Sequence, residues 1–294
     1  MTGLTIEDLT VRIPVRPGEV VHAVTEVCLE IPAGTVTALA GESGCGKSIV
    51  ASTILGVLPP RAVTTGSVRL ELADRSLDIL ADREPYRGRH IALVPQSPGT
   101  HFTPVRTIGS QLTETIAALG TGHDPADLLT RAGLEPTALG KFPHELSGGM
   151  AQRAAVAAAL AGDPAVIVAD EPTAGLDRAR TDQIGALLRD CADQGAAVLL
   201  ITHDLAHLLR AGIADTLAIM YASRLMEVGP ATQVLDDPWH DYTRDLLAAL
   251  PERGLRPLPH PPRPLTNLSE LCPYAGTPTA LARRDQRLIR EPRP

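Results

Sequence analysis

The sequence lacks long apolar runs, paired cysteines and an excess of basic residues, and each absence excludes a class of protein. No apolar stretch approaches the ~18 residues that a helix needs to cross a bilayer, which argues against a membrane-spanning chain. The four cysteines are far apart and form no CxxC pair, so we expect no disulfide framework or structural zinc site, and a reducing cytoplasm fits. The 34 acidic and 27 basic residues give a formal charge of −7, which disfavours a protein held to nucleic acid or anionic lipid by its overall charge.

The length and the N-terminal residues further limit the class of protein to which the chain can belong. A chain of 294 residues, 44% of them apolar, is long enough for one large domain or two small ones with a proper core. Residues 1–20 contain several charged side chains and no apolar core of the kind that a secretory signal has. We therefore expect a chain that is not secreted.

Strand and helix patterns alternate along the chain, which predicts an α/β fold with a mainly parallel sheet. Alternating apolar residues at 4–13 and 24–31 predict an N-terminal antiparallel β subdomain. Short apolar runs predict buried strands at residues 35–40, 91–94, 165–169, 197–201 and 216–220. Helical patterns lie at residues 48–57, 178–191 and 205–211, and at about 99–162, where we expect an inserted α-helical subdomain.

The composition changes after Leu250, which divides the chain into two parts. Six prolines fall within residues 251–264, a density typical of an extended linker, and we expect the tail beyond it to pack loosely. The expected organisation is one domain at residues 1–250 and a Pro-rich C-terminal extension at residues 251–294.

A glycine-rich cluster between the predicted strand at 35–40 and the predicted helix at 48–57 fits the pattern G-x-x-x-x-G-K-[ST]. Its residues are Gly41, Glu42, Ser43, Gly44, Cys45, Gly46, Lys47 and Ser48. Glycines let successive backbone N–H groups turn inward around a phosphate, and the positive end of the following helix adds to that attraction. In such a loop Lys47 reaches the β- and γ-phosphates and the hydroxyl of Ser48 ligates Mg²⁺. We therefore expect a P-loop NTPase core that binds ATP and Mg²⁺.

The predicted strand at residues 165–169 ends in two acids, Asp170 and Glu171. An acid at the tip of a buried strand beside a phosphate loop can hold Mg²⁺, which is the role expected for Asp170. Glu171 points in a different direction and is the candidate general base that polarises the attacking water.

The order of the remaining motifs resembles that of the ABC-type ATPases. Residues 146–153, LSGGMAQR, resemble the signature motif of that family, and Gln96 resembles its Q-loop glutamine. Residues 174–177, which end at Asp177, resemble the D-loop, and His203 resembles the switch histidine.

Further details make the chain resemble the ATP-binding subunits of oligopeptide, dipeptide and nickel importers. Met150 stands where most ABC proteins have glutamine, and residues 143–145 and 224–251 are also similar to this group. The resemblance covers residues 1–250 well and the tail poorly. It implies an ATPase on the cytoplasmic face of the cell membrane, which powers uptake of peptides, nickel or a related chelated metal.

The resemblance also implies how the site is assembled. Two such domains pair head to tail in this family, so that each ATP lies between one phosphate loop and the signature of its partner. The signature residues here are Ser147, Gly148 and Gly149, which open a helix whose N-terminal amides would face the γ-phosphate.

Site roles follow from the same resemblance. Gln96 would sense Mg²⁺ and water, and His203 would contact the γ-phosphate and help to position the water near Glu171. The expected catalytic residues are Glu171, His203, Gln96 and Lys47, the expected Mg²⁺ ligands are Ser48, Gln96 and Asp170, and Asp177 joins the nucleotide-binding set.

The partners implied by the resemblance are two transmembrane permease subunits, an extracytoplasmic substrate-binding protein and a second ATPase subunit, which is either a different chain or another copy. No nucleic-acid partner is expected.

The alternative to an importer subunit is an ABC ATPase that moves no solute, such as a translation or DNA-maintenance factor. Those proteins typically have two ATPase domains in one chain, a long coiled-coil insertion or zinc modules, none of which the sequence indicates. A second alternative, export of a drug or peptide, is disfavoured by residues 240–250.

The sequence departs from the family in two places. Residues 13–23 contain no Phe, Tyr or Trp, although the family often has an aromatic residue there that stacks on adenine. Arg16 and His22 are candidates to replace it, against an ordinary role as surface residues. Cys272 has no second cysteine nearby, so no iron–sulfur cluster of the kind seen in the group is expected.

Overall fold

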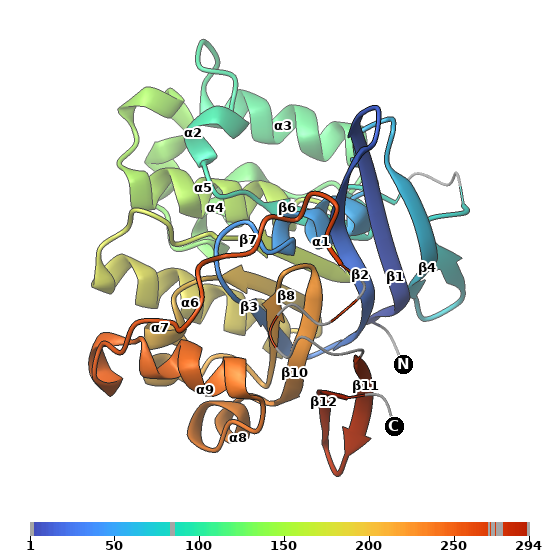
Figure 1. The fold of residues 1–294 in the computed structure, drawn as a ribbon. Coiled ribbons are helices and arrows are strands. Elements are labelled where there is room, and N and C mark those ends of the chain that lie inside the picture. The colour runs from blue at the N-terminus through green and yellow to red at the C-terminus, as the bar shows by residue number, and fades with distance from the viewer. Residues whose placement is uncertain (1–2, 83–85, 270, 272–273, 275–278, 293–294) are drawn as a thin grey trace.

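The structure, a computed structural model, describes residues 3–82, 86–269, 271, 274 and 279–292. Two sheets form its frame, with helices packed around the larger one (Figure 1). This is the α/β arrangement with an antiparallel N-terminal sheet that the sequence predicts.

The larger sheet has the strand order β11-β12-β10-β9-β3-β8-β7-β6. Its central strands run parallel and are β3 (Val36–Ala40), β6 (Ile91–Val94), β7 (Val166–Asp170), β8 (Ala197–Thr202) and β9 (Thr216–Tyr221). Antiparallel strands extend it on one side: β10 (Arg224–Pro230), β11 (Thr279–Arg284) and β12 (Arg287–Pro292). Every residue of β3 and β8 is buried, which explains why both strands read as continuous apolar runs.

The smaller sheet is antiparallel and has the order β2-β1-β4-β5. Its strands are β1 (Gly3–Arg16), β2 (Glu19–Pro32), β4 (Val63–Glu71) and β5 (Ser76–Asp78). Buried and exposed residues alternate along much of β1 and β2, as expected for a sheet with one face on the core. Strands β1 and β2 are both longer than the patterns at 4–13 and 24–31 indicate, and β4 and β5 carry no pattern strong enough to be predicted.

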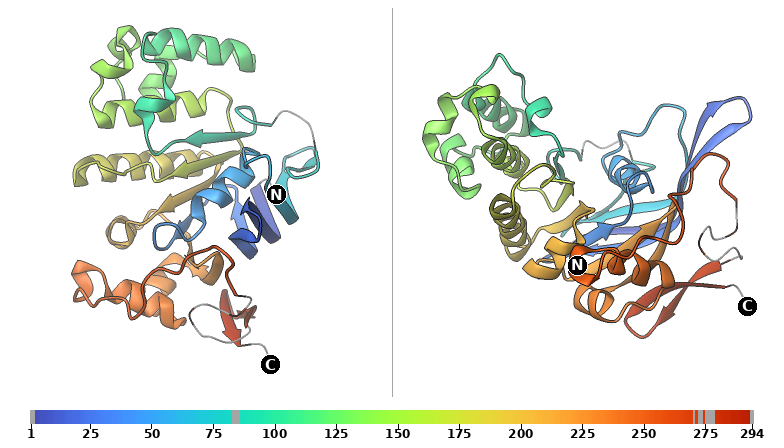
Figure 2. Two further views of the ribbon diagram at one scale, coloured as in Figure 1. Left: turned by 45° about the horizontal axis from the view of Figure 1, so that its top comes forward. Right: turned by 60° about the vertical axis from the view of Figure 1, so that its left-hand side comes forward.

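Helices cover the larger sheet and fill the segment between β6 and β7 (Figure 2). That segment contains α2 (Pro98–His101), α3 (Ile108–Leu119), α4 (Pro125–Arg131), α5 (Gly148–Leu160) and the 3-10 turns η1 (Pro136–Gly140) and η2 (Pro143–Glu145). Elsewhere lie α1 (Lys47–Ile54), α6 (Arg178–Asp193), α7 (Leu205–Ala211), α8 (Ala231–Asp236), α9 (Asp241–Ala248) and η3 (Pro251–Arg253). Within the described residues, no helix is both long and apolar enough to span a bilayer.

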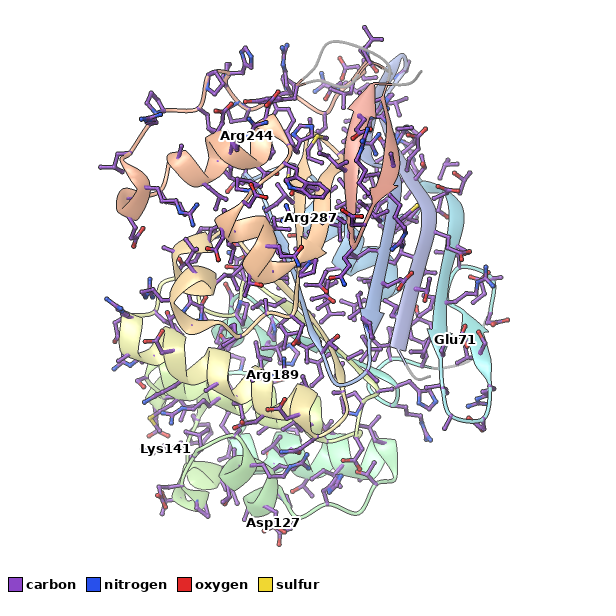
Figure 3. The ribbon with its side chains drawn as sticks, turned by 90° about the horizontal axis from the view of Figure 1, so that it is seen from below. Glu71, Asp127, Lys141, Arg189, Arg244 and Arg287 are labelled. Carbon is purple, nitrogen blue, oxygen red and sulfur yellow. The ribbon has the colours of Figure 1, made fainter. Side chains whose placement is uncertain are left out.

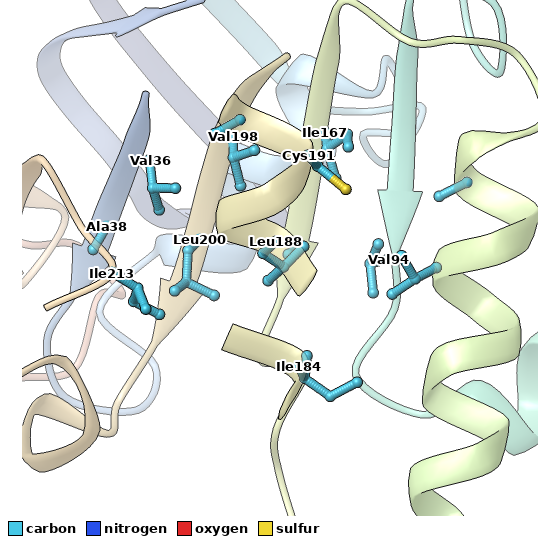
Figure 4. Packing of buried hydrophobic residues seen from close by; sticks show 14 of the residues in the cluster. Val36, Ala38, Val94, Ile167, Ile184, Leu188, Cys191, Val198, Leu200 and Ile213 are labelled. Atoms are coloured by element: carbon cyan, nitrogen blue, oxygen red, sulfur yellow. The ribbon is translucent and has the colours of Figure 1, made fainter. Parts of the chain in front are cut away.

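The main core lies between the parallel strands and the helices. Ile184, Leu188 and Cys191 of α6 pack in the same buried cluster as Val36 and Val198 of the sheet (Figure 4). Helix α1 ends at Ile54, three residues before the end of the predicted helix. The other predicted helices and buried strands are confirmed to within about two residues.

The expectation of a loosely packed tail is wrong for its final hairpin. Strand β12 pairs with β10, and β11 pairs with β12, so the end of the chain completes the larger sheet. Arg287 is 4% exposed and lies 3.2 Å from the carboxylate of Glu227, whose side chain is fully buried (Figure 3). The proline-rich composition before the hairpin does not predict this docking. Composition indicates local stiffness of the chain, and it does not indicate which distant strand a segment pairs with. Cys272 lies outside the described residues.

Candidate functional site

The phosphate loop connects β3 to α1 and leaves room only for glycine at two positions. Gly46 has a φ of 113°, and a Cβ atom there would lie 2.2 Å from the carbonyl oxygen of Ala23. Gly41 has a φ of 150°, and its Cβ atom would lie 2.0 Å from the carbonyl oxygen of Met220. These close approaches explain the two glycines of the motif, because the backbone of the loop passes too near to neighbouring backbone to leave space for a side chain.

Lys47 is the first residue of α1 and is 4% exposed. Its ammonium group donates hydrogen bonds to the carbonyl oxygens of Gly41 and Glu42, each at 2.8 Å. The ammonium group also lies 3.9 Å from the sulfur of Cys45, so all three contacts are to neutral groups of its own loop. A buried cation held in this way is suited to exchange these contacts for phosphate oxygens, because a charged acceptor binds it more strongly.

Ser48 and Asp170 lie together beside the loop. The hydroxyl of Ser48 donates to Oδ1 of Asp170 at 3.4 Å. Burial raises the pKa of the Asp170 carboxyl, while the hydrogen bond from Ser48 and the charge of Lys47 act in the opposite direction. An oxygen pair of this kind fits the donor set that Mg²⁺ prefers, and a cation there would favour the charged carboxylate.

Glu171 lies between two of the other predicted residues. Its Oε2 accepts a hydrogen bond from Nε2 of Gln96 at 2.8 Å, and its Oε1 lies 3.3 Å from Nδ1 of His203. The backbone of Glu171 has a φ of 46°, a left-handed conformation that is uncommon outside glycine, and its N–H donates to the carbonyl oxygen of Ile201 at 2.9 Å. Strand β7 therefore ends at Asp170, and Glu171 already lies in the turn that follows it.

The topology explains why these residues meet. Gln96 follows β6, Glu171 follows β7 and His203 follows β8, and these strands are parallel neighbours in the sheet (Figure 1). The phosphate loop follows β3, the next strand along. Carboxyl ends of parallel strands share one edge, so loops far apart in the sequence converge there.

A cavity of about 380 Å³ opens at this edge. Its polar end is lined by Lys47, Ser48, Gln96 and Glu171, and its apolar residues are Ile13, Val21, Ala23, Ile49 and Leu265. The size, the cationic end and the apolar residues fit a nucleoside triphosphate. A larger cavity of about 440 Å³ lies between the N-terminal sheet and the C-terminal hairpin, and its described lining contains none of the predicted site residues. The chemistry of the side chains, and not cavity size, therefore identifies the site.

The signature residues lie elsewhere on the surface. Ser147 caps α5, and its hydroxyl accepts a hydrogen bond from the backbone N–H of Met150 at 3.3 Å. Asp177 caps α6 in the same way, with Arg180 as the donor at 3.0 Å. A Cβ atom on Gly149 would lie 2.9 Å from the side chain of Arg180, so the starts of the two helices lie against each other.

Both Ser147 and Gly148 are exposed, and Gly149 is buried. None of the three belongs to the described lining of the nucleotide-sized cavity. The chain thus brings the phosphate loop, Gln96, the two acids and His203 together, and leaves the signature apart from them.

Two contacts of the site were not predicted. The hydroxyl of Tyr242, on α9, lies 3.4 Å from the carboxylate of Glu42 in the phosphate loop. Leu265 of the C-terminal extension lines the cavity. Nothing in the local sequence predicts that either residue contacts the site, because both lie more than 190 residues after the phosphate loop along the chain.

Burial and contacts bear on Cys45 of the phosphate loop and on Arg16 and His22, the two candidates for the adenine contact. Cys45 is 5% exposed, and burial raises the pKa of its thiol, which opposes a reactive thiolate. Neither Arg16 nor His22 belongs to the described lining of the cavity. Among the residues that the structure describes, no group of three or more His, Cys, Asp or Glu side chains is arranged to hold a metal ion.

Comparison with known proteins identifies a matching family and similar transport proteins. Residues 24–174 match the family model described as ABC transporter. The chain is 34% identical over 289 residues to the dipeptide transport ATP-binding protein DppD of Bacillus subtilis, which covers 95% of this chain and 82% of that protein. It is 38% identical over 261 residues to the oligopeptide transport ATP-binding protein AmiE of Streptococcus pneumoniae, covering 85% of this chain and 72% of that protein.

Solved structures share the fold. An ATP-binding subunit of an ABC transporter superposes with a TM-score of 0.65 at 25% identity, over 79% of this chain and 92% of that one. The ATP-binding cassette MJ0796, in a dimeric post-hydrolysis state bound to ADP and Pi, superposes with a TM-score of 0.66 at 24% identity, over 78% of this chain and 98% of that one.

Proposed function

Because this chain belongs to the ABC transporter family, as an ATP-binding subunit and ATPase, we propose that it powers the uptake of peptides across the cytoplasmic membrane. The similarity to dipeptide and oligopeptide transport proteins over most of the chain supports peptides as the substrate class. Nickel or a related chelated metal is the second candidate, since the motifs of such importers resemble those quoted above.

The observation that carries the proposal is the position of Glu171. Its carboxylate is held by Gln96 and lies beside His203, at a cavity that Lys47 and Ser48 also line. In this arrangement Glu171 polarises the attacking water as general base, Gln96 and His203 orient that water, and Lys47 binds the β- and γ-phosphates. Most of the catalysis is positioning and charge neutralisation.

Mg²⁺ fits beside the phosphate loop. Ser48, Asp170 and Gln96 would hold it, and the ion would neutralise charge on the phosphate oxygens. The hydrogen bond between Ser48 and Asp170 keeps both oxygens on one side of the loop, which supports this assignment.

The exposed signature supports a paired assembly. Ser147 and Gly148 are accessible and lie outside the cavity of their own chain, so they are free to complete the nucleotide site of a second cassette arranged head to tail. With its own phosphate loop and its own signature, the chain is chemically able to pair with another copy or with a different ATPase subunit.

The complete importer would contain two transmembrane permease subunits and an extracytoplasmic substrate-binding protein, with this chain on the cytoplasmic face of the membrane. Within the chain, residues 1–250 would form the ATPase domain, which includes the helical subdomain at about 99–162, and residues 251–294 would form the extension.

The test is affinity purification of the tagged full-length chain from detergent-solubilised membranes, with wild type and Glu171→Gln in parallel. We expect two polytopic membrane proteins to be recovered with both, and ATP hydrolysis with the wild type alone. Uptake of radiolabelled tripeptide and of radiolabelled nickel by cells carrying each variant then decides the substrate class.

Recovery of ribosomes or DNA in place of membrane proteins would favour the alternative, an ABC ATPase of translation or DNA maintenance. Hydrolysis that persists in Glu171→Gln would remove Glu171 from the mechanism.

A further inference from the structure

The apolar end of the nucleotide-sized cavity is built from two distant parts of the chain. Ile13 of β1 and Val21 of β2 are paired residues of the N-terminal sheet, and Ala23, which lies at a register shift between the two strands, also lines the cavity. Leu265, from the proline-rich extension, completes this group. These four residues (13, 21, 23 and 265) are called the apolar wall below.

Leu265 is fixed by backbone pairing with β2. The N–H of His22 donates to the carbonyl oxygen of Leu265 at 2.8 Å, and the N–H of Asn267 donates to the carbonyl oxygen of Val20 at 2.8 Å. Val21 and Thr266 form an antiparallel bridge between these two hydrogen bonds. The extension therefore attaches by a single β-bridge to the outer edge of β2, which is the edge strand of its sheet (Figure 1).

The side chain of Asn267 strengthens this attachment. Its Oδ1 accepts from the N–H of Val20 at 2.9 Å, and its Nδ2 donates to the carbonyl oxygen of Gly18 at 3.1 Å. Asn267 itself has a φ of 49°, a conformation that Asn tolerates better than most residues. The extension is thus tied to the start of β2 by three hydrogen bonds and to the preceding turn by a fourth, and together they hold Leu265 at the cavity.

The chemistry of the wall suits a purine ring. The faces of a purine are flat and apolar, and branched aliphatic side chains gain dispersion contacts when they pack against them. The described lining of the cavity contains no Phe, Tyr or Trp that could stack on the base. The N–H groups of Val20 and His22 already donate to the extension, so neither is open to a base.

We propose that Leu265, with Ile13 and Val21, forms the surface against which the adenine ring packs, so that the C-terminal extension is part of the nucleotide site. This proposal rests on the proposed function, because it assumes that ATP binds with its phosphates at Lys47. The wall recognises the base by apolar contact, and the extension replaces the aromatic residue that residues 13–23 lack.

The test compares ligands with and without a base. Leu265→Ala should weaken the binding of ATP and ADP to the full-length chain by on the order of 3- to 10-fold, because apolar contact with the ring is lost. Binding of inorganic tripolyphosphate, which has no base, should not change. Isothermal titration of the three ligands measures both effects, and the tripolyphosphate value also shows that the variant is folded.

Leu255→Ala is the matched control, since Leu255 lies in the same extension, is 68% exposed and does not line the cavity. It should bind all three ligands as the wild type does. Unchanged ATP and ADP binding in Leu265→Ala would overturn the proposal, and so would an equal loss of tripolyphosphate binding. A wild-type chain that binds neither ATP nor tripolyphosphate would instead overturn the proposed function on which the wall depends.

Discussion

Gln96 donates a hydrogen bond to the carboxylate of Glu171 at 2.8 Å, although 75 residues separate them along the chain. The contact joins the loop after β6 to the loop after β7, on the edge where the phosphate loop also lies. The hydrogen bond links the segment that leads into the helical insertion to Glu171, the proposed general base. A movement of that segment would therefore also move the carboxylate of Glu171.

The first prediction concerns Glu171. Glu171→Gln removes the negative charge but keeps a side chain that can pair with Gln96, so we expect ATP to bind normally and turnover to fall by roughly 10²–10⁴-fold. Steady-state hydrolysis and nucleotide titration on the purified chain measure the two quantities. Glu252→Gln, an exposed change remote from the cavity, should leave both unaffected.

The second prediction concerns His203, whose Nδ1 lies 3.3 Å from Glu171. Without the imidazole the water and the γ-phosphate lose an orienting group, so His203→Ala should lower turnover by about 10²-fold while ATP binding is retained. The exposed His260 provides the control variant, His260→Ala. Near-normal hydrolysis in His203→Ala would show that His203 has no part in the reaction.

The third prediction separates binding from assembly. Ser147 is exposed and lies outside its own cavity, so Ser147→Arg should leave ATP binding by the isolated chain unchanged. Hydrolysis by the assembled complex should fall strongly, because the arginine would occupy the space of the partner's γ-phosphate. If isolated Ser147→Arg subunits bound ATP poorly, the signature would act on its own chain, contrary to head-to-tail pairing.

The fourth prediction concerns the docking of the C-terminal hairpin. Arg287 pairs with the buried Glu227 and lies over the ring of Trp239 at 4.2 Å. Arg287→Ala leaves a buried carboxylate without its cation and should lower the free energy of unfolding by about 3–5 kcal/mol. Denaturant unfolding measures this loss.

The matched control for that variant is Arg284→Ala on the same hairpin. Arg284 is 62% exposed and its ion pair with Glu291 is screened by solvent, so its loss should lower the free energy of unfolding far less than the loss of Arg287 does. Equal costs for the two arginines would contradict the importance of the buried pair.

The fifth prediction is a pH dependence of stability. Burial lowers the pKa of His240 from 6.5 to about 4, opposed by the charge of Asp241 and assisted by Arg290 and Arg244. The unfolded chain therefore takes up a proton on His240 between about pH 6.5 and 4 while the folded chain does not, so stability falls as the pH is lowered through that range.

His240→Asn isolates this effect. His240 caps α9 by accepting a hydrogen bond from the N–H of Tyr242, and an asparagine oxygen can accept the same bond without titrating. The difference in unfolding free energy between pH 7 and pH 4.5 should be smaller in His240→Asn than in the wild type, by on the order of 2 kcal/mol. An identical pH dependence would mean that His240 is protonated in the folded chain.

The sequence alone was sufficient to predict the parallel strands, most of the helices and the phosphate loop. These features depend on local chemistry: buried strands such as Ala197–Thr202 are continuous apolar runs, and a loop whose backbone passes within van der Waals contact of a neighbour needs glycine, as at Gly46. The order of the motifs also indicated the family, which the comparisons confirm.

The tertiary structure alone decided how distant segments meet. That Glu171 lies between Gln96 and His203 follows from strand order, which sequence periodicity does not encode. That Arg287 docks on Glu227 follows from the pairing of β12 with β10, and that Leu265 lines the cavity follows from the bridge between Val21 and Thr266. Local patterns report what a residue prefers as a neighbour, and only the folded chain determines which neighbour it has.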